Sequence, residues 1–254
     1  MTTPTTYLFI VTGASRGMGL AMAQQLLRPA NHVLCLSRTR ITALHTAAEK
    51  AGATLTQWQT DLADGEAAAF RLQEWLNTQP PTHYASATLI NNAGVIPALV
   101  PLRDSSPADL AHALRVGLEA PMQLCAAFLA GTRDWAATRK ILNISSGLGR
   151  RAMASQSGYC AAKAGMDHFT RCLAMDEALS PNGAKVCSLA PGVIDTDMQV
   201  QLRGADAANF PDRGSFEGLK TNGQLTSPEE AARRVLAYLA RPDFGEQPVA
   251  DVRG

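Results

Sequence analysis

Short apolar runs alternate with longer helical stretches along this 254-residue chain, and this alternation most constrains its fold. The seven runs are YLFIV, HVLCLS, TLTQWQ, ATLIN, KILNIS, KVCSLA and QPVADV, which begin at residues 7, 32, 54, 87, 140, 185 and 247. Most are apolar throughout, which is typical of parallel strands buried on both faces by right-handed crossover helices. We therefore predict a single-domain, Rossmann-type doubly wound α/β fold with a mostly seven-stranded parallel sheet and helices on both faces.

Helices are expected between these strands, near residues 17–28, 41–51, 65–77, 108–131, 157–179 and 228–240. Residues 195–225 break the rhythm with scattered Gly, Asp and Asn. Ligands of open parallel sheets bind beyond the carboxyl ends of the strands. We therefore predict one domain over residues 1–254, with an insertion near 195–225 that covers the substrate.

The composition limits the partners of the chain. With 23 basic and 22 acidic residues, the net charge is +1, so a basic surplus for nucleic acid or an anionic membrane is absent. The N-terminus lacks the pattern of a signal peptide, and the longest nearly apolar stretch, EAPMQLCAAFLAG, is shorter than the roughly 20 residues of a membrane span. The five cysteines and five histidines show no ligand spacing. These features predict a soluble cytoplasmic protein with a small-molecule partner and no metal.

A glycine-rich stretch, TGASRGMG, follows the first predicted strand. Gly13, Gly17 and Gly19 allow close approach of a phosphate, and the following helix offers unpaired N–H groups and a partial positive charge. The spacing is G-x-x-x-G-x-G. The same residues also fit G-x-S-x-G, with Ser15 as the nucleophile of an α/β-hydrolase, although such a turn normally follows several strands and an HGGG-type loop is lacking.

The second strand ends in LCLSRTR, where an NAD-specific dinucleotide fold would carry an acidic residue. Ser37 and Arg38 stand there instead, and Arg16 lies in the glycine loop. Two guanidinium groups suit the 2′-phosphate of NADP(H). Solvated surface arginines are the alternative.

The sequence SGYCAAKAGM places Tyr159 four residues before Lys163 in a predicted helix. Residues at this spacing share one helix face. A phenol with the usual pKa of about 10 is roughly one part in a thousand ionised at pH 7, and a nearby ammonium lowers that pKa. The pair therefore suits proton transfer, unless the tyrosine only packs inward and the lysine is solvated.

Taken in order, TGASRGMG, TDLAD with Asp61, NNAG at 91–94, NISS at 143–146, YCAAK at 159–163 and PGVIDTD at 191–197 resemble the motifs of the short-chain dehydrogenase/reductase family. The resemblance implies that Tyr159 is the catalytic acid, that Lys163 binds the nicotinamide ribose and lowers the tyrosine pKa, and that Ser146 holds the substrate carbonyl. It also implies a cofactor-binding set of Gly13, Ser15, Arg16, Gly17, Met18, Gly19, Ser37, Arg38, Asp61, Leu62, Asn92, Ala93, Gly94, Tyr159, Lys163, Pro191, Gly192, Ile194 and Thr196.

The C-terminal third is similar to the sepiapterin reductase branch of the family, which includes bacterial benzil reductases. This resemblance implies an NADPH-dependent carbonyl reductase acting on a small aromatic, dicarbonyl or pterin-like ketone. Asp251 matches a residue that anchors the pterin, although it could simply end a strand. The expected substrate-binding residues are Ser146, Leu148, Tyr159, Met198, Leu202 and Asp251, and Phe210 and Phe216 could add to an apolar cover.

One position departs from the family pattern. Gly117 stands in RVGLEAP where the family usually has an Asn that positions a water for the proton relay. The alternative that this substitution favours is a non-catalytic NADP(H)-binding sensor of the same fold. The resemblance further implies a homodimer, with a homotetramer as the other possibility.

Overall fold

The computed structural model describes residues 6–253 and contains one seven-stranded parallel sheet. The strand order is β3-β2-β1-β4-β5-β6-β7, with every neighbouring pair parallel. The strands are β1 Thr6–Thr12, β2 Asn31–Ser37, β3 Thr54–Gln59, β4 Tyr84–Asn91, β5 Thr138–Ile144, β6 Lys185–Ala190 and β7 Val249–Asp251. The predicted doubly wound sheet is therefore confirmed.

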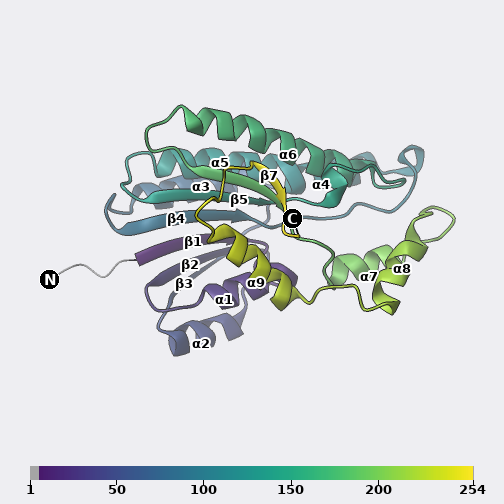
Figure 1. Ribbon diagram of the computed structural model, residues 1–254, viewed down its shortest axis with the longest axis horizontal. Coiled ribbons are helices and arrows are strands. Elements are labelled where there is room, and N and C mark those ends of the chain that lie inside the picture. Colours follow the sequence, from purple (N-terminus) through teal and green to yellow (C-terminus); the bar gives the residue numbers. More distant parts are fainter. Residues whose placement is uncertain (1–5, 254) are drawn as a thin grey trace.

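Helices cover both faces of the sheet (Figure 1). The helices are α1 Gly17–Leu26, α2 Thr42–Ala51, α3 Gly65–Asn77, α4 Pro107–Leu114, α5 Ala120–Gly131, α6 Ser157–Ala178, α7 Asp197–Arg203, α8 Arg213–Thr221 and α9 Pro228–Leu239. Helices α3, α4, α5 and α6 lie over one face, and α1, α2 and α9 over the other. The strand order changes direction between β1 and β4, so the carboxyl ends of these strands flank the crevice in which such folds bind ligands.

The apolar strands contribute side chains to two separate cores, one on each face of the sheet. In β4, Leu89 packs into the core under α3 and α5, whereas its neighbour Ile90 packs into the core under α1 and α9. Both side chains are fully buried. Successive residues of a strand point to opposite faces, so a strand that is covered on both sides must be apolar at every position.

The stretch predicted as one helix over 108–131 contains an irregular turn. Helices α4 and α5 are joined without a break by a π-helical turn at Arg115–Glu119, which includes Gly117. A Cβ atom at Gly117 would lie 3.2 Å from the Ala162 Cβ on α6, so the two helices approach closely at this point.

This composite helix also bears on the expected absence of a membrane span. Pro107–Gly131 is 25 residues long, and an 18-residue window within it has a mean hydropathy of 1.2, so it meets the length and hydropathy of a span, contrary to the expectation from the shorter apolar run. Half of its most apolar window is buried inside the protein, and the helix packs against α3 and α6. Core packing therefore accounts for its apolar composition.

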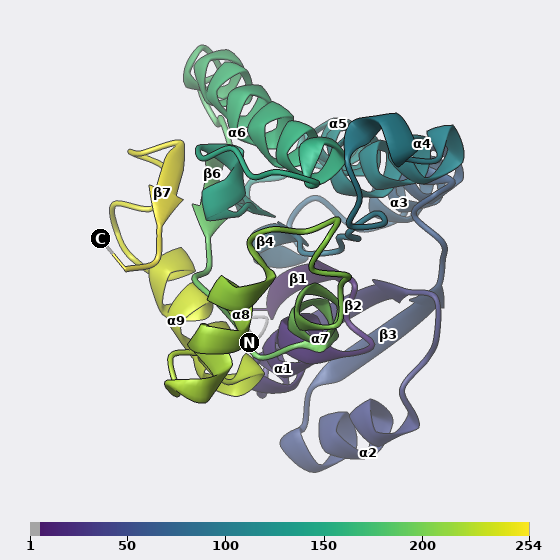
Figure 2. The same ribbon diagram turned by 90° about the vertical axis from the view of Figure 1, so that its right-hand side faces the viewer.

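Two short helices, α7 and α8, lie beyond the carboxyl ends of the strands (Figures 1 and 2). They lie within residues 195–225, which we call the lid segment. Leu202 of α7 and Phe216 of α8 form a third apolar cluster with Leu99 and Phe210. The sequence pattern predicted the insertion but neither of its helices.

Candidate active site

A cavity of about 1040 Å³ lies at the carboxyl ends of the strands. It runs from the glycine loop and the end of β2 to the lid segment, and the start of α6 forms part of its wall. All of the residues predicted to bind the cofactor line it: Gly13, Ser15, Arg16, Gly17, Met18, Gly19, Ser37, Arg38, Asp61, Leu62, Asn92, Ala93, Gly94, Tyr159, Lys163, Pro191, Gly192, Ile194 and Thr196.

The glycine loop has a backbone that requires glycine. Gly13 and Gly17 have φ values of +68° and +53°, in the left-handed region. A Cβ at Gly19 would lie 2.2 Å from the Gly13 carbonyl oxygen, which no side chain could tolerate. The loop therefore folds tightly at the N-terminus of α1, where backbone N–H groups suit a phosphate.

The loop is held by contacts from the end of β4. The Asn92 side-chain amide donates a hydrogen bond of 2.9 Å to the Thr12 carbonyl, and the backbone N–H groups of Asn92 and Ala93 donate to Thr12 Oγ1 at 2.9 and 3.0 Å. The role of Thr12 was missed in the sequence, where its only signal is its place directly before Gly13. Asn92 thus acts on the loop geometry as well as lining the cavity.

The two arginines near the end of β2 differ in their contacts. Arg16 Nη1 donates to the Asp197 carboxylate of α7 at 2.9 Å, so this guanidinium is already paired. Arg38 is exposed at the cavity and makes no side-chain hydrogen bond or ion pair within residues 6–253. Arg38 is therefore the guanidinium that is free for an anionic group.

Tyr159 and Lys163 lie together in the first turns of α6. Lys163 Nζ is 5.7 Å from the centre of the Tyr159 ring and donates a 2.7 Å hydrogen bond to the Ile144 carbonyl at the end of β5. Only 4% of Lys163 is exposed, so the alternative of a solvated lysine is wrong. Gly94 passes close by, since a Cβ there would be 3.8 Å from Lys163 Nζ.

Burial shifts the pKa values of both groups toward their neutral forms. Burial raises the pKa of Tyr159 to about 12, opposed by a hydrogen bond with Ser146. Burial lowers the pKa of Lys163 to about 8, opposed by the negative charge of Asp167 one turn further along α6. Near neutral pH, the phenol keeps its proton and the lysine is charged.

Ser146 stands at the start of a 3₁₀ turn, Gly147–Gly149, where its hydroxyl accepts a hydrogen bond of 3.2 Å from the Leu148 N–H. Both Ser145 and Ser146 line the cavity. The hydrogen bond with Tyr159 involves Ser146, whereas the buried Ser145 hydroxyl has no partner in the described part of the chain. The geometry thus brings Ser146, Tyr159 and Lys163 to one wall of the cavity.

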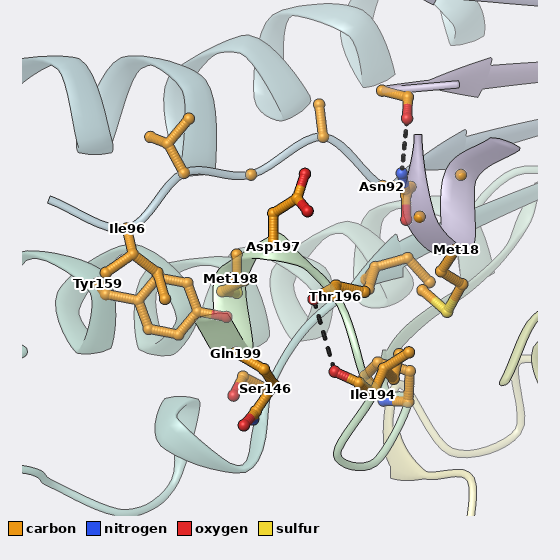
Figure 3. A pocket seen from close by; sticks show the side chains of 18 of the residues that line it. Met18, Asn92, Ile96, Ser146, Tyr159, Ile194, Thr196, Asp197, Met198 and Gln199 are labelled. Atoms are coloured by element: carbon orange, nitrogen blue, oxygen red, sulfur yellow. Dashed lines mark hydrogen bonds between the residues drawn. The ribbon is translucent and has the colours of Figure 1, made fainter. Parts of the chain in front are cut away.

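The predicted substrate residues Leu148, Met198 and Leu202 also line the cavity, as does Phe216. Figure 3 shows Met198 in the cavity together with Ser146 and Tyr159. Phe210 does not line it but stacks on Phe216, with 5.6 Å between the ring centres.

Asp251, the remaining predicted substrate residue, does not line the cavity. Its carboxylate accepts two hydrogen bonds of 2.8 Å from the Arg253 guanidinium and is not part of the cavity wall, whereas Arg253 is. Since the carboxylate is already paired, the structure does not bring Asp251 to the substrate end as the pterin reading requires.

Other polar residues of the cavity were missed in the sequence. Gln156, Gln199 and Arg151 line it, and His112 reaches it from α4. Gln156 is the N-cap residue of α6, directly before its first residue Ser157. Within residues 6–253, Ser15 forms no hydrogen bond with a histidine, and no group of three His, Cys, Asp or Glu side chains could hold a metal.

Comparison with known proteins places this fold and site in a family. The model of the short chain dehydrogenase family matches residues 8–207. The chain is 32% identical over 235 residues to benzil reductase ((S)-benzoin forming) of Bacillus cereus, covering 92% of this chain and 94% of that one. It is 28% identical over 245 residues to sepiapterin reductase of Meriones unguiculatus, covering 92% of each.

A solved structure from Beutenbergia cavernae, described as an NAD(P)-dependent gluconate 5-dehydrogenase with bound NADP, superposes with a TM-score of 0.81. It is 27% identical and covers 98% of this chain and 96% of its own.

The chain belongs to the short-chain dehydrogenase family and is therefore an oxidoreductase. Its relatives include the benzil and sepiapterin reductases that the C-terminal third resembles. The site fits the nicotinamide cofactor of such enzymes, because the left-handed glycines leave room for a pyrophosphate and the cavity is continuous from Arg38 to Tyr159. The family match therefore rules out the alternative interpretation of Ser15 as the nucleophile of an α/β-hydrolase.

Proposed function

We propose that this protein is an NADPH-dependent carbonyl reductase. The observation that carries the proposal is the meeting of Ser146, Tyr159 and the buried Lys163 at one wall of a cavity whose other end is the glycine loop. The cavity wall near them is apolar where Leu148, Met198 and Leu202 contribute to it. A small ketone with an aromatic or otherwise flat apolar body suits that wall.

Each of the three residues has a distinct role in the proposal. The hydroxyls of Ser146 and Tyr159 bind the carbonyl oxygen of the substrate, and the bound nicotinamide supplies the hydride for the carbonyl carbon. The Tyr159 phenol then gives its proton to the oxygen, which yields the alcohol and leaves a phenolate. Because the raised pKa keeps Tyr159 protonated at neutral pH, the acid is present in the required form. The Lys163 ammonium stabilises the phenolate.

The return of the proton to Tyr159 requires a path without a side chain at residue 117. Gly117 offers no side chain to bind water, and Lys163 Nζ donates to the Ile144 carbonyl at 2.7 Å. We propose that the Lys163 ammonium gives a proton to the phenolate and regains one from solvent, while the Ile144 carbonyl accepts its hydrogen bond and holds the amino group in place.

The preference for NADPH over NADH rests on the end of β2. Arg38 has no carboxylate partner among residues 6–253, and Ser37 stands where an acidic residue would repel a 2′-phosphate. The Ser37 hydroxyl donates to the Thr39 carbonyl at 2.7 Å, which leaves its oxygen able to accept only. Arg38 is therefore the main candidate for the phosphate contact.

The proposed substrate class rests on the similarity to benzil reductases and on the apolar wall of the cavity. Benzil reductase relatives and the apolar wall favour an aromatic or dicarbonyl ketone, whereas a pterin loses its expected anchor because Asp251 is paired with Arg253. The lid segment, as part of the single domain, would cover this substrate.

A homodimer remains part of the proposal. Leu114, Met122 and Met175 are exposed apolar residues on α4, α5 and α6 that a partner could cover. Light scattering of the purified protein measures the oligomeric state. A cytoplasmic location stays a prediction.

Tyr159→Phe tests the proposed function. The variant removes only the hydroxyl, so reduction of benzil, followed as NADPH oxidation, should fall by at least about a thousandfold while NADPH binding persists. A non-catalytic NADPH sensor, the alternative that Gly117 favours, would show no turnover in the unmodified protein, and the substitution would then change nothing. NADPH fluorescence titration is the control for binding.

A further inference from the structure

Lys163 is enclosed, yet the proposed reaction requires it to regain a proton from solvent in every turnover. Lys163 is 4% exposed, and its amino group is held by the Ile144 carbonyl at the end of β5. Each alcohol takes up one hydride and one proton, and that proton leaves Tyr159. Gly117 supplies no side chain for the return of the proton. Other polar groups around Lys163 must therefore connect it with bulk water.

A buried carboxylate with an unused oxygen lies one turn beyond Lys163 on α6. The Asp167 side chain is only 2% exposed. Its Oδ1 atom accepts a hydrogen bond of 2.6 Å from Ser188 Oγ on β6, whereas its Oδ2 atom has no hydrogen-bond partner within residues 6–253. Since an unpaired buried charge is costly, the free oxygen points to a small hydrogen-bonding ligand such as water.

The surroundings of this oxygen connect it with the surface. Arg150 Nε lies 3.6 Å from Asp167 Oδ2, which is too far for a direct hydrogen bond but suits a bridging water. A Cβ at Gly149 would lie 2.8 Å from Oδ2 and 3.0 Å from the Lys163 carbonyl oxygen, so the glycine leaves both oxygens uncrowded. The Arg150 side chain is 36% exposed and donates to the Ala250 carbonyl at 3.2 Å. Arg150 therefore links the buried carboxylate with solvent.

A second unpaired oxygen lies close to Lys163 on β5. The Asn143 side chain donates to Thr170 Oγ1 of α6 at 2.9 Å, and the next residue, Ile144, packs into the core on the opposite face of the sheet. Because side chains alternate along a strand, Ser145 again faces α6. Its hydroxyl is buried and has no partner among the described residues. Ser145 thus directly follows the residue whose carbonyl holds Lys163.

We propose that Ser145 and Asp167 position the waters that return a proton from solvent to Lys163, with Arg150 at the outer end of this path. The inference rests on the proposed function and deepens it. For each alcohol formed, the Lys163 ammonium gives one proton to the Tyr159 phenolate. The resulting amine takes one proton from the nearest water, and each water takes one from the next, so that solvent supplies the proton. Asp167 remains a carboxylate and Ser145 a hydroxyl throughout.

The test separates the first turnover from later ones. Tyr159 already holds the proton for the first alcohol, so a defect in proton return slows only repeated turnover. The variants are Asp167→Asn and Ser145→Ala, with benzil as the ketone. On the neutral plateau of each pH profile, kcat for NADPH oxidation should fall roughly tenfold or more. The rate constant of a single turnover, measured with enzyme in excess over benzil, should change less than about twofold.

Two further readouts distinguish a proton path from a structural role. Because proton return then limits turnover, kcat of both variants should be more sensitive to D2O than kcat of the wild-type protein. The double variant should be about as slow as the slower single variant, because both residues serve one path. The matched controls are Asp176→Asn and Ser180→Ala, which alter exposed side chains near the C-terminal end of α6 and should keep both wild-type rates.

Distinct results overturn distinct statements. Equal losses in kcat and in the single-turnover rate, an unchanged kcat, or losses that multiply in the double variant would overturn the proton path and leave the carbonyl reductase intact. A wild-type protein that binds NADPH but oxidises it with no ketone or aldehyde would overturn the proposed function itself.

Discussion

At the scale of single residues, burial decides the chemistry of the active site. Tyr159 and Lys163 would be an ordinary solvated pair on an exposed helix, but enclosure shifts the pKa of the phenol to about 12 and that of the ammonium to about 8. Asp167 lies one turn beyond Lys163 with 1% exposure, and its Oδ1 accepts a 2.6 Å hydrogen bond from Ser188. Its charge keeps the pKa of Lys163 from falling further.

These pKa values predict the pH dependence of the reduction. Since the ammonium is present below its pKa, kcat/KM should be flat at neutral pH and fall as pH rises through about 8, whereas Tyr159 keeps its proton until about 12. Asp167→Asn removes the charge that raises the pKa of Lys163, so the fall should begin at lower pH. A pH series with the exposed Asp176→Asn on the same helix as control measures this, and superimposable profiles would contradict it.

As the pH rises above about 8, the Lys163 contribution to stability and the turnover change in opposite directions. The folded-state pKa of Lys163 lies below its unfolded value of 10.5, so between about 8 and 10.5 the unfolded chain binds more protons at this group. The Lys163 contribution to the free energy of unfolding therefore rises with pH in that window, while turnover declines. Loss of activity just above pH 8 should accordingly occur without unfolding.

Arg38 carries the prediction of cofactor choice. Arg38→Ala should raise the Kd for NADPH roughly ten- to hundredfold, because it removes a charged partner of the 2′-phosphate, and should leave the Kd for NADH unchanged. Arg16→Ala is the matched comparison and should have the smaller effect, since Arg16 is paired with Asp197. Equal losses for NADPH and NADH would show that Arg38 does not distinguish the two cofactors.

At the scale of elements, short turns at the carboxyl ends of strands build the cavity. The turn between β1 and α1 is packed so tightly against the end of β4 that Gly19 has no space for a side chain, with the Asn92 Nδ2 atom 2.4 Å from a Cβ there. The continuous helix of α4 and α5 similarly approaches α6 at Gly117 through its π-helical turn. Close packing thus excludes a side chain at Gly19 and leaves little room for one at Gly117.

Gly19→Ala tests this packing. The new methyl group would meet the Gly13 backbone carbonyl, which cannot move without displacing the loop, so NADPH affinity should fall at least roughly tenfold and the melting temperature should drop. The control is Gly218→Ala in α8, where a Cβ meets nothing within 4 Å and alanine gains about 0.5–1 kcal/mol of helix stability. Isothermal titration and thermal melts distinguish the two variants, and unchanged NADPH binding in Gly19→Ala would contradict the packing argument.

At the scale of the whole molecule, the described residues form three separate apolar clusters. Two of them lie on the faces of the sheet and hold the fold together, and the third lies under α7 and α8 in the lid segment. Phe128 in α5 belongs to the first cluster and Phe210 to the third, and both are fully buried. Since this cluster is separate from the two cores of the sheet, we expect residues 195–225 to unfold locally at a lower free energy than the sheet.

Substituting the two phenylalanines separates these roles. Phe128→Ala should lower the free energy of unfolding by about 3–5 kcal/mol, because it leaves a cavity in the main core. Phe210→Ala should lower the melting temperature less, speed amide hydrogen exchange within residues 195–225 and raise KM for the ketone. Exchange that increases uniformly over the sheet in Phe210→Ala would show that the lid segment is not a separate unit.

The sequence by itself determined the sheet, the glycine loop and the pairing of Tyr159 with Lys163, because alternation and spacing are local properties that neighbouring residues impose on each other. The tertiary structure decided the rest. Arg16 pairs with Asp197, 181 residues away, Lys163 donates to the Ile144 carbonyl of β5, and the buried Gln156 amide has no partner within residues 6–253. Whether a side chain is free, paired or enclosed depends on distant segments that meet only in the folded chain, and no local pattern records those distances.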